Sequence, residues 1–511
     1  MENNSISLQQ FTNHPEVVKA LSDLRTHFSA HNQLLVSDIY IKADDEKKTQ
    51  ELQFVNLVQE GGGVLGVGLI GYTWLLEEMG IRFYSLAGTS AGAINTMLLA
   101  ALGRPEEKKS EKILEELCQK DFFDFVDGTR LVKVLIKNIF TRTNYIADIK
   151  KKLTLLFGAG IFIPLIGVLI LSLCNLQDEK TFTLKFVLAG LTILVWTIII
   201  ALFIVLKTLN NKFYSSGYGI NPGKTFYDWI NSILQKYGAD TMTSLYNKML
   251  IKPDEEDGKN VAKHLNLDLR KSGNDDTRDL EDLPRKLAIV TSDITIQNKI
   301  EFPDMAGLYW DDVNAVCPAH FVRASMSIPV FFEAYQVTIP SQSKKVQDAW
   351  KEFQNCNSPD IPTYARFIDG GMISNFPINI FHNPNQKIAR LPTFGIRLDD
   401  LSDELKHKVQ FDQTEQQFKS FGEYIWSMFN TVRYYYDKDF LLKHRLYNNS
   451  IGKINTENFN WLNFNLTDDE KIRLFVRGVK AAKDFLINFK WEEYKANRKE
   501  ILNTIKGKDK K

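Results

Sequence analysis

Hydrophobic residues gather in short runs along most of this chain, and each run is bounded by polar residues or glycines. The runs at 54–58, 83–87 and 364–368 have the length and composition of buried strands. Two further runs, at 286–293 and 392–398, fit the same description. The pattern therefore predicts strands contributed by distant parts of the chain.

Two longer runs, 153–174 and 186–206, contain no charged residue. Each has about 21 or 22 residues, and a helix of that length crosses a hydrocarbon core of about 30 Å. The link at 175–185 is short and polar, and lysines at 150–152 and at 207 flank the pair. Because basic flanks stay on the cytoplasmic side, the runs predict a transmembrane hairpin with both ends in the cytoplasm. The alternative is a pair of buried helices in a soluble core.

A glycine-rich segment, Gly61-Gly62-Gly63-Val64-Leu65-Gly66, follows the first strand-like run. Successive glycines can turn several backbone N–H groups toward one point, as an oxyanion hole requires. A flexible turn and a phosphate-binding loop are the alternatives. The segment does satisfy G-x-G-x-x-G, and Glu77 and Glu78 follow at a suitable distance. Both acids fall inside the next helical pattern rather than at a strand end, so nucleotide binding is the minor interpretation.

A G-x-S-x-G pentapeptide, Gly88 to Gly92, lies between the run at 83–87 and a helix-like stretch at 93–102. A serine at such a strand-to-helix turn has its Oγ exposed at the edge of the sheet. The start of the helix favours developing negative charge. This context, more than the pentapeptide alone, marks Ser90 as a candidate nucleophile.

The strand-like run at 364–368 leads directly into Asp369-Gly370-Gly371. An isolated Asp-Gly-Gly is usually a turn, but the three motifs together fit one chemistry. Ser90 attacks a carbonyl carbon and Asp369 accepts its proton. The amides expected to hold the oxyanion belong to Gly61, Gly62, Gly63 and Val64. The glycines expected to support the motifs are Gly66, Gly88, Gly92, Gly370 and Gly371.

The sequence resembles the patatin-like phospholipase family, whose signature is a glycine-rich oxyanion loop, G-x-S-x-G and D-G-G in that order. A fourth block agrees, since 323–332 resembles the family's arginine-alanine-serine segment leading into a proline. The resemblance runs with interruptions from about residue 52 to about 400. It implies a three-layer α/β domain with a mainly parallel sheet, and hydrolysis of lipid esters by a serine–aspartate dyad.

The chain departs from the family pattern at Leu65. The family usually carries arginine or lysine before the last glycine of its oxyanion loop, where a cation helps to stabilise negative charge. With leucine there, the backbone amides must suffice, which puts the efficiency of catalysis or the head group of the substrate in doubt.

A Ser-Asp-His triad is the alternative to the dyad, because His382 and His444 follow Asp369 in the order that α/β-hydrolases use. Neither histidine lies in a recognisable loop at the end of a strand. A dyad requires Asp369 to act as a base although the usual pKa of aspartate is about 3.9. Burial beside apolar neighbours would raise that pKa, so we favour the dyad.

Composition narrows the functional classes. The net charge is +1, which gives no global field for binding nucleic acid. The four cysteines, Cys118, Cys174, Cys317 and Cys356, are scattered without metal-binding spacing, as is usual in a reducing compartment. The N-terminus has no basic region followed by an apolar core, so we expect no cleaved signal peptide. We expect neither a metal nor a cofactor.

The sequence predicts five parts. Residues 1–50 form an N-terminal helical segment, and 51–150 form the first half of the catalytic domain with the oxyanion loop and the nucleophile. The hairpin occupies 151–210, the second half of the catalytic domain occupies 211–400, and a helical region occupies 401–511. Two spans return the chain to one side of the membrane, which lets Ser90 and Asp369 meet.

The expected protein is an integral membrane serine hydrolase of lipid esters, with phospholipids as the expected substrate and with its catalytic domain and both termini in the cytoplasm. Membrane lipids are then both its substrate and its surroundings. An esterase or thioesterase for a soluble acyl substrate is one alternative. A membrane effector or scaffold with a vestigial site is another. The sequence leaves the oligomeric state open.

Overall fold

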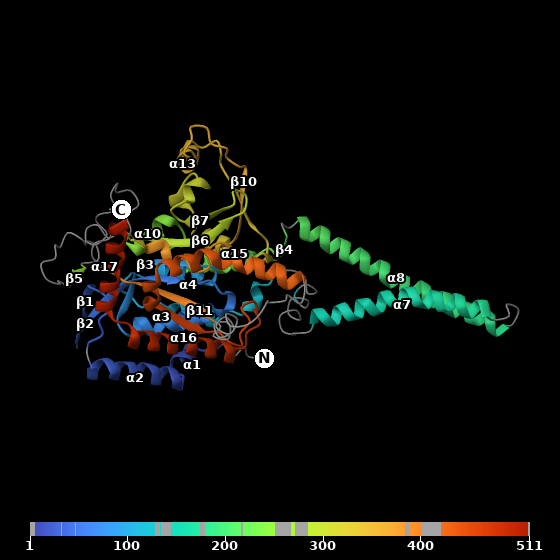
Figure 1. Cartoon of the computed structure of the whole chain (residues 1–511), viewed down its shortest axis with the longest axis horizontal. Coiled ribbons are helices and arrows are strands. Elements are labelled where there is room, and N and C mark those ends of the chain that lie inside the picture. The colour runs from blue at the N-terminus through green and yellow to red at the C-terminus, as the bar shows by residue number, and fades with distance from the viewer. Residues whose placement is uncertain are drawn as a thin grey trace. The chain divides into compact units, whose positions relative to one another are not determined.

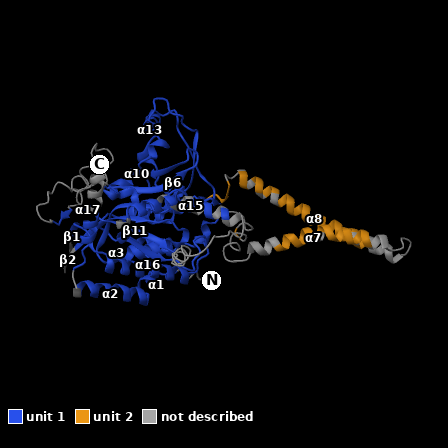
Figure 2. Cartoon of the chain, viewed as in Figure 1, with its two compact units in different colours: residues 1–127, 223–511 blue, residues 128–222 orange. Residues whose placement is uncertain are grey.

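The chain folds into two compact units, which Figure 2 distinguishes by colour. The first comprises Met1–Asp127 and Gly223–Lys511, and the second is the inserted stretch Gly128–Pro222. The five-part division made from the sequence remains a prediction. The computed structural model describes residues 6–31, 33–45, 48–127, 133, 145–173, 179–215, 218–250, 267–270, 285–383, 389–399 and 421–508.

The first unit is built on a large mixed sheet (Figure 1). Its centre consists of neighbouring parallel strands in the order β12 (Ile451–Asn455), β11 (Thr393–Asp399), β2 (Lys48–Gln59), β3 (Ile81–Thr89) and β6 (Leu287–Asp293). The strands that pair antiparallel are β10 (Tyr364–Asp369), β9 (Tyr335–Thr338), β7 (Asn298–Phe302), β1 (Ile39–Asp45) and β5 (Asp268–Leu269). Strands are present at all five runs that the hydrophobic pattern predicted.

The helices that follow the parallel strands pack on one another beside the sheet. α3 (Gly66–Glu78) joins β2 to β3 and is buried along nearly its whole length. It packs against α4 (Ala91–Ala101), which follows β3, and against α16 (Asp468–Asn488). α16 begins with a capping box, in which Thr467 and Glu470 each bind the other's backbone N–H.

An apolar cluster joins the sheet to α15 (Phe421–Lys443). Phe440 and Leu441 of this helix pack on a cluster that includes Val58 of β2 and Ala87 of β3. The sheet and its helices confirm the predicted α/β fold class. The other α-helices and strands among the described residues of this unit are α1 (Leu8–Thr12), α2 (Pro15–His31), α5 (Ser110–Cys118), α9 (Lys224–Lys236), α10 (Met242–Met249), α12 (Ala319–Ser325), β8 (Val330–Phe332), α13 (Lys344–Gln354) and α17 (Trp491–Lys508).

Two terminal segments differ from the helical regions that the sequence predicted. Residues 1–50 contain β1 and the start of β2 besides α1 and α2, and 401–511 contains β12 besides its helices. β1 pairs with β2 and with the two-residue β5, and Lys42, Asp44 and Asp45 interrupt its apolar positions. Because a strand near the edge of a sheet carries polar residues, it lacks the continuous hydrophobic run that reveals a central strand.

The second unit contains α7 (Tyr145–Leu173), α8 (Glu179–Ser215) and β4 (Gly219–Asn221), and its two long helices pack on each other. Among the described residues, one helical stretch, Lys151–Leu169, is long and apolar enough to cross a membrane, and the apolar stretch Ala189–Val205 in α8 is shorter. The predicted two-span hairpin at 153–174 and 186–206 therefore remains a prediction. Large apolar side chains that are more than half exposed on these helices include Leu155, Phe162, Val168, Ile193 and Phe203.

Candidate active site

Ser90 lies at the turn between β3 and α4, where the backbone takes an uncommon conformation. Its φ is 54° and its ψ is −122°, and a conformation of this kind costs a residue with a side chain about 1–3 kcal/mol. The turn is also tight, because a Cβ on Gly92 would lie 2.4 Å from the carbonyl oxygen of Gln59. The last glycine of G-x-S-x-G is therefore required by the close approach of β2.

Asp369 occupies the last position of β10, with its carboxylate next to Ser90. Its Oδ2 accepts a 2.7 Å hydrogen bond from Ser90 Oγ, and its Oδ1 accepts a 2.7 Å bond from the N–H of Gly371. Ser90 is 3% exposed and Asp369 is 6% exposed. The two residues meet because β10 pairs with β6, and β6 pairs with β3. The structure thus places the predicted nucleophile and the predicted base in direct contact.

The segment that begins with α12 holds both residues. Ser325 Oγ accepts a 2.9 Å bond from the backbone N–H of Ser90 and donates a 2.6 Å bond to the carbonyl of Val290 in β6. Two residues later, the carbonyl of Ser327 accepts a 2.8 Å bond from the N–H of Asp369. The sequence marked this segment only through its family resemblance and gave it no role. Its contacts show that it positions the nucleophile and the acid together.

The glycine-rich loop lies against Ser90, since a Cβ on Gly61 would be 2.9 Å from Ser90 Cβ. The N–H of Gly61 donates to Asn375 (3.0 Å), and that of Val64 donates to the carbonyl of Trp461 (3.1 Å). Within the described part of the chain, the N–H groups of Gly62 and Gly63 have no such partner. The four predicted oxyanion donors are therefore reduced to two, because Gly61 and Val64 already donate to protein carbonyls.

Glu60, the residue before the glycines, is a buried acid that the sequence did not reveal. Its Oε2 accepts a 2.7 Å bond from the N–H of Leu398, and its Oε1 accepts a 3.2 Å bond from Asn375 Nδ2. The same Nδ2 donates to the carbonyl of Gly61 (3.1 Å). Burial raises the pKa of Glu60 to about 7, although the nearby Arg397 opposes the shift. Glu60 thus ties the oxyanion loop to the segment after Asp369.

Asp437 of α15 supports the same segment from another side. Its carboxylate accepts 2.8 Å bonds from the hydroxyl of Ser374 and from the backbone N–H of Phe376. Burial raises the pKa of Asp437 to about 6, against the effect of these hydrogen bonds. Since Ser374 and Phe376 flank Asn375, the buried carboxylates of Glu60 and Asp437 together fix this short stretch.

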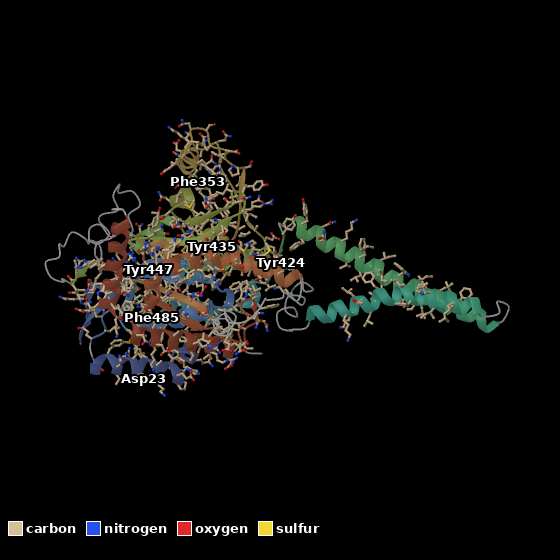
Figure 3. The ribbon with its side chains drawn as sticks, in the orientation of Figure 1. Asp23, Phe353, Tyr424, Tyr435, Tyr447 and Phe485 are labelled. Atoms are coloured by element: carbon tan, nitrogen blue, oxygen red, sulfur yellow. The ribbon has the colours of Figure 1, made fainter. Side chains whose placement is uncertain are left out.

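The histidines considered for a triad lie in a different cluster. His382 Nδ1 is 2.8 Å from the hydroxyl of Tyr447, which Figure 3 labels, and the ring centroids of His382 and His444 are 4.7 Å apart. Burial and the charge of Arg498 lower the pKa of His382 to about 4. In contrast, the Ser90 hydroxyl contacts the carboxylate of Asp369 and Met326 Sδ. Ser90 therefore has a carboxylate rather than an imidazole as its hydrogen-bond acceptor.

Leu65 occupies the position at which the family usually carries a basic residue. It is buried at the junction between the loop and α3. Because its side chain is apolar, it brings no charge to the oxyanion position. Among the described residues, no group of three or more His, Cys, Asp or Glu side chains is placed to hold a metal ion.

Comparison with known proteins identifies the family. The patatin-like phospholipase model matches residues 57–382, a stretch that contains the glycine-rich loop, the nucleophile turn and the Asp-Gly-Gly motif. The chain belongs to this family. As a patatin-like protein it is a lipid acyl hydrolase, and the resemblance seen in the sequence is confirmed.

Two individual proteins are similar to this patatin-like chain. An uncharacterised protein of Bacillus subtilis (strain 168), YqhO, is 22% identical over 433 residues, which cover 85% of this chain and 98% of YqhO. The crystal structure of VipD from Legionella pneumophila matches 89% of this chain and 71% of its own, with 12% identity and a TM-score of 0.30.

Replacing Glu60 of this patatin-like chain with glutamine should remove part of the pH dependence of its stability. A raised pKa means that the folded protein holds the proton more tightly than the unfolded chain does. The corresponding stability is present below the usual pKa of 4.5 and is lost as the pH rises toward 7. At about 1.36 kcal/mol per pKa unit, the loss is roughly 3 kcal/mol.

Thermal unfolding in detergent, followed from pH 4.5 to pH 7, measures this loss of stability. The unfolding midpoint of the wild type should fall more steeply with pH than that of Glu60→Gln. Glu352→Gln on the exposed surface of α13 is the matched control and should follow the wild type. Parallel profiles for wild type and Glu60→Gln would contradict a raised pKa.

Proposed function

We propose that this protein is a membrane-anchored serine hydrolase that cleaves carboxylic ester bonds of lipids, most directly phospholipids, through Ser90 and Asp369. The observation that carries the proposal is the buried 2.7 Å hydrogen bond from Ser90 Oγ to Asp369 Oδ2, on a nucleophile turn with positive φ. A serine strained into such a turn and bonded to a carboxylate is arranged for nucleophilic attack.

The proposed reaction has two halves. Ser90 Oγ attacks the ester carbon while its proton passes to Asp369 Oδ2, and the carbonyl oxygen becomes an oxyanion. The N–H groups of Gly62 and Gly63 and the start of α4 stabilise that charge. When the C–O bond breaks, the leaving alkoxide takes the proton from Asp369, and the acyl group stays on Ser90. Water then attacks the acyl-enzyme, Asp369 accepts its proton, and Ser90 leaves with a proton restored.

Gly371 contributes to the role of Asp369 in this scheme. Its N–H donates to Oδ1, so the carboxylate is held with Oδ2 facing the serine. The dyad therefore depends on this orientation, because proton transfer concerted with attack needs correct geometry first.

An apolar pocket beside the nucleophile supports a lipid substrate. It is lined by Ala91, the residue after Ser90, and by Met326, whose Sδ is 3.4 Å from Ser90 Oγ. Gly63 and Val64 of the oxyanion loop line it as well. A hydrocarbon chain attached to the reacting carbonyl would leave water for this pocket, which is favourable in proportion to the apolar area buried.

The inserted unit supports the membrane part of the proposal. The stretch Lys151–Leu169 of α7 is long and apolar enough to span a bilayer, and α8 adds the shorter stretch Ala189–Val205. In this proposal the two helices form a hairpin, and the lysines on its flanks keep both ends and both chain termini in the cytoplasm. Anchoring confines the site near its substrate and raises the effective concentration of lipid esters.

Replacing Asp369 with asparagine tests the dyad. This substitution keeps the shape of the side chain and removes the base, so fatty acid release from phosphatidylcholine vesicles should fall by several orders of magnitude. His382→Gln should retain most of the activity, because the histidine contacts Tyr447 and not the serine. Full activity of Asp369→Asn, or loss of activity in a His382→Gln protein with a normal unfolding midpoint, would contradict the dyad.

Replacing the two long helices tests the anchor. A variant with a short Gly/Ser linker in place of Tyr145–Ser215 should become soluble and still hydrolyse p-nitrophenyl butyrate, because no proposed catalytic group is removed. Its rate on phospholipid vesicles should drop on the order of 10²-fold as the effective concentration is lost. Vesicle hydrolysis at the rate of the intact protein would contradict anchoring, and so would extraction of the intact protein from membranes by salt alone.

A further inference from the structure

The two chain segments that flank the inserted unit meet in the first unit and form an aromatic cluster. Before the insertion, the short 3₁₀ turn Phe122–Phe125 supplies Phe125, and after it α9 supplies Phe226 and Trp229. The ring centroid of Phe125 lies 5.4 Å from that of Phe226 and 4.9 Å from that of Trp229. The rings of Phe125 and Phe226 are almost perpendicular, at 85°, the edge-to-face arrangement that aromatic pairs favour.

This aromatic cluster is one wall of the pocket beside Ser90. Phe125, Phe226 and Trp229 line the same pocket as Ala91 and Met326, which adjoin the nucleophile. None of the described residues that line the pocket carries a charge. The pocket therefore has a largely apolar lining that extends from the neighbours of the reacting serine to the segments on either side of the insertion.

A hydrogen-bonded clasp fixes the distance between the two flanking segments. The carboxylate of Asp127 accepts a 3.2 Å bond from the backbone N–H of Thr225 and a second bond from the Thr225 hydroxyl. Asp127 lies two residues after Phe125, and Thr225 comes directly before Phe226. The clasp therefore sets how closely the two halves of the aromatic wall approach.

The clasp also adjoins the element that holds the catalytic residues. Gly223 has a φ of 70°, and a Cβ there would lie 2.6 Å from Arg323 Nε of α12. Burial lowers the pKa of Arg323 to about 10, and the negative charge of Asp127 is among the effects that oppose this shift. Arg323 Nη1 donates a 2.6 Å bond to Ser327 Oγ. Through Arg323, the flanking segments are thus connected to Ser327, whose carbonyl binds the N–H of Asp369.

We propose that these flanking segments form the wall that determines acyl-chain specificity, and that the Asp127–Thr225 clasp sets the position of this wall. The proposal rests on the proposed function, because it takes the occupant of the pocket to be the hydrocarbon chain of the acyl group on Ser90. Each methylene group transferred from water to an apolar wall favours binding about fourfold. Displacing the wall should therefore change the turnover of long acyl chains far more than that of acetate.

The test compares kcat/KM for p-nitrophenyl acetate, butyrate, octanoate and palmitate in detergent, using the full chain. Thr225→Val keeps the shape of the side chain but removes the hydroxyl donor of the clasp, and Trp229→Ala removes part of the wall from a half-buried position. In both variants the ratio of octanoate to acetate turnover should fall about tenfold, chiefly through KM. Thr243→Val is the matched control. The hydroxyl of Thr243, on α10, donates to the carbonyl of Asn314, so its removal should leave the ratio as in the wild type.

The outcomes separate this inference from the proposed function. If the wild type hydrolyses the esters but both variants keep its chain-length profile, the wall does not determine specificity, and the proposed function stands. An equal fall for all four esters would also overturn the inference, since it would indicate damage to the dyad. If the wild type hydrolyses none of the esters and no phospholipid, the proposed function itself fails.

Discussion

The hydrogen bond between Ser90 Oγ and Asp369 Oδ2 is the contact on which the arrangement of this unit depends. The serine comes from a parallel strand near the middle of the sheet, and the acid comes from an antiparallel strand two places away. A bond of 2.7 Å between buried groups tolerates little displacement of either strand. The strained turn at Ser90 and the Asp-Gly-Gly turn must therefore be held in position by their surroundings.

Much of that support comes from hydrogen bonds to short segments rather than from the sheet itself. Ser325 binds the backbone of Ser90, and Ser327 binds the backbone of Asp369, so one helix end fixes both halves of the site. Glu60 accepts a hydrogen bond from the side chain of Asn375, and Asp437 accepts one from the backbone N–H of the next residue, Phe376. Burying carboxylates in this way is costly unless they accept hydrogen bonds, and both of them do.

The sequence predicted those parts of the fold and of the site that have a strong local sequence pattern. Ser90 and Asp369 could be found because their turns require glycines at fixed positions. β2, β3 and β6 could be found because buried central strands are predominantly apolar. β1 escaped prediction because its positions are partly polar. The sequence could not show that Val64 donates to Trp461, because that bond joins residues far apart in the chain. The same reason hid Glu60 and Asp437, whose partners lie on other elements.

The pocket beside the nucleophile lies in the first unit, and part of its lining comes from the chain segments that precede and follow the insertion. Hydrolysis through the dyad requires that Ser90 carry the acyl group of the lipid during turnover. Mass spectrometry of the Ser90 peptide, after acid quenching of the protein during hydrolysis of phosphatidylcholine vesicles, tests it most directly. A fatty acyl adduct should appear on Ser90 and be absent from Ser90→Ala. Continued hydrolysis by Ser90→Ala, or an adduct on a different residue, would contradict it.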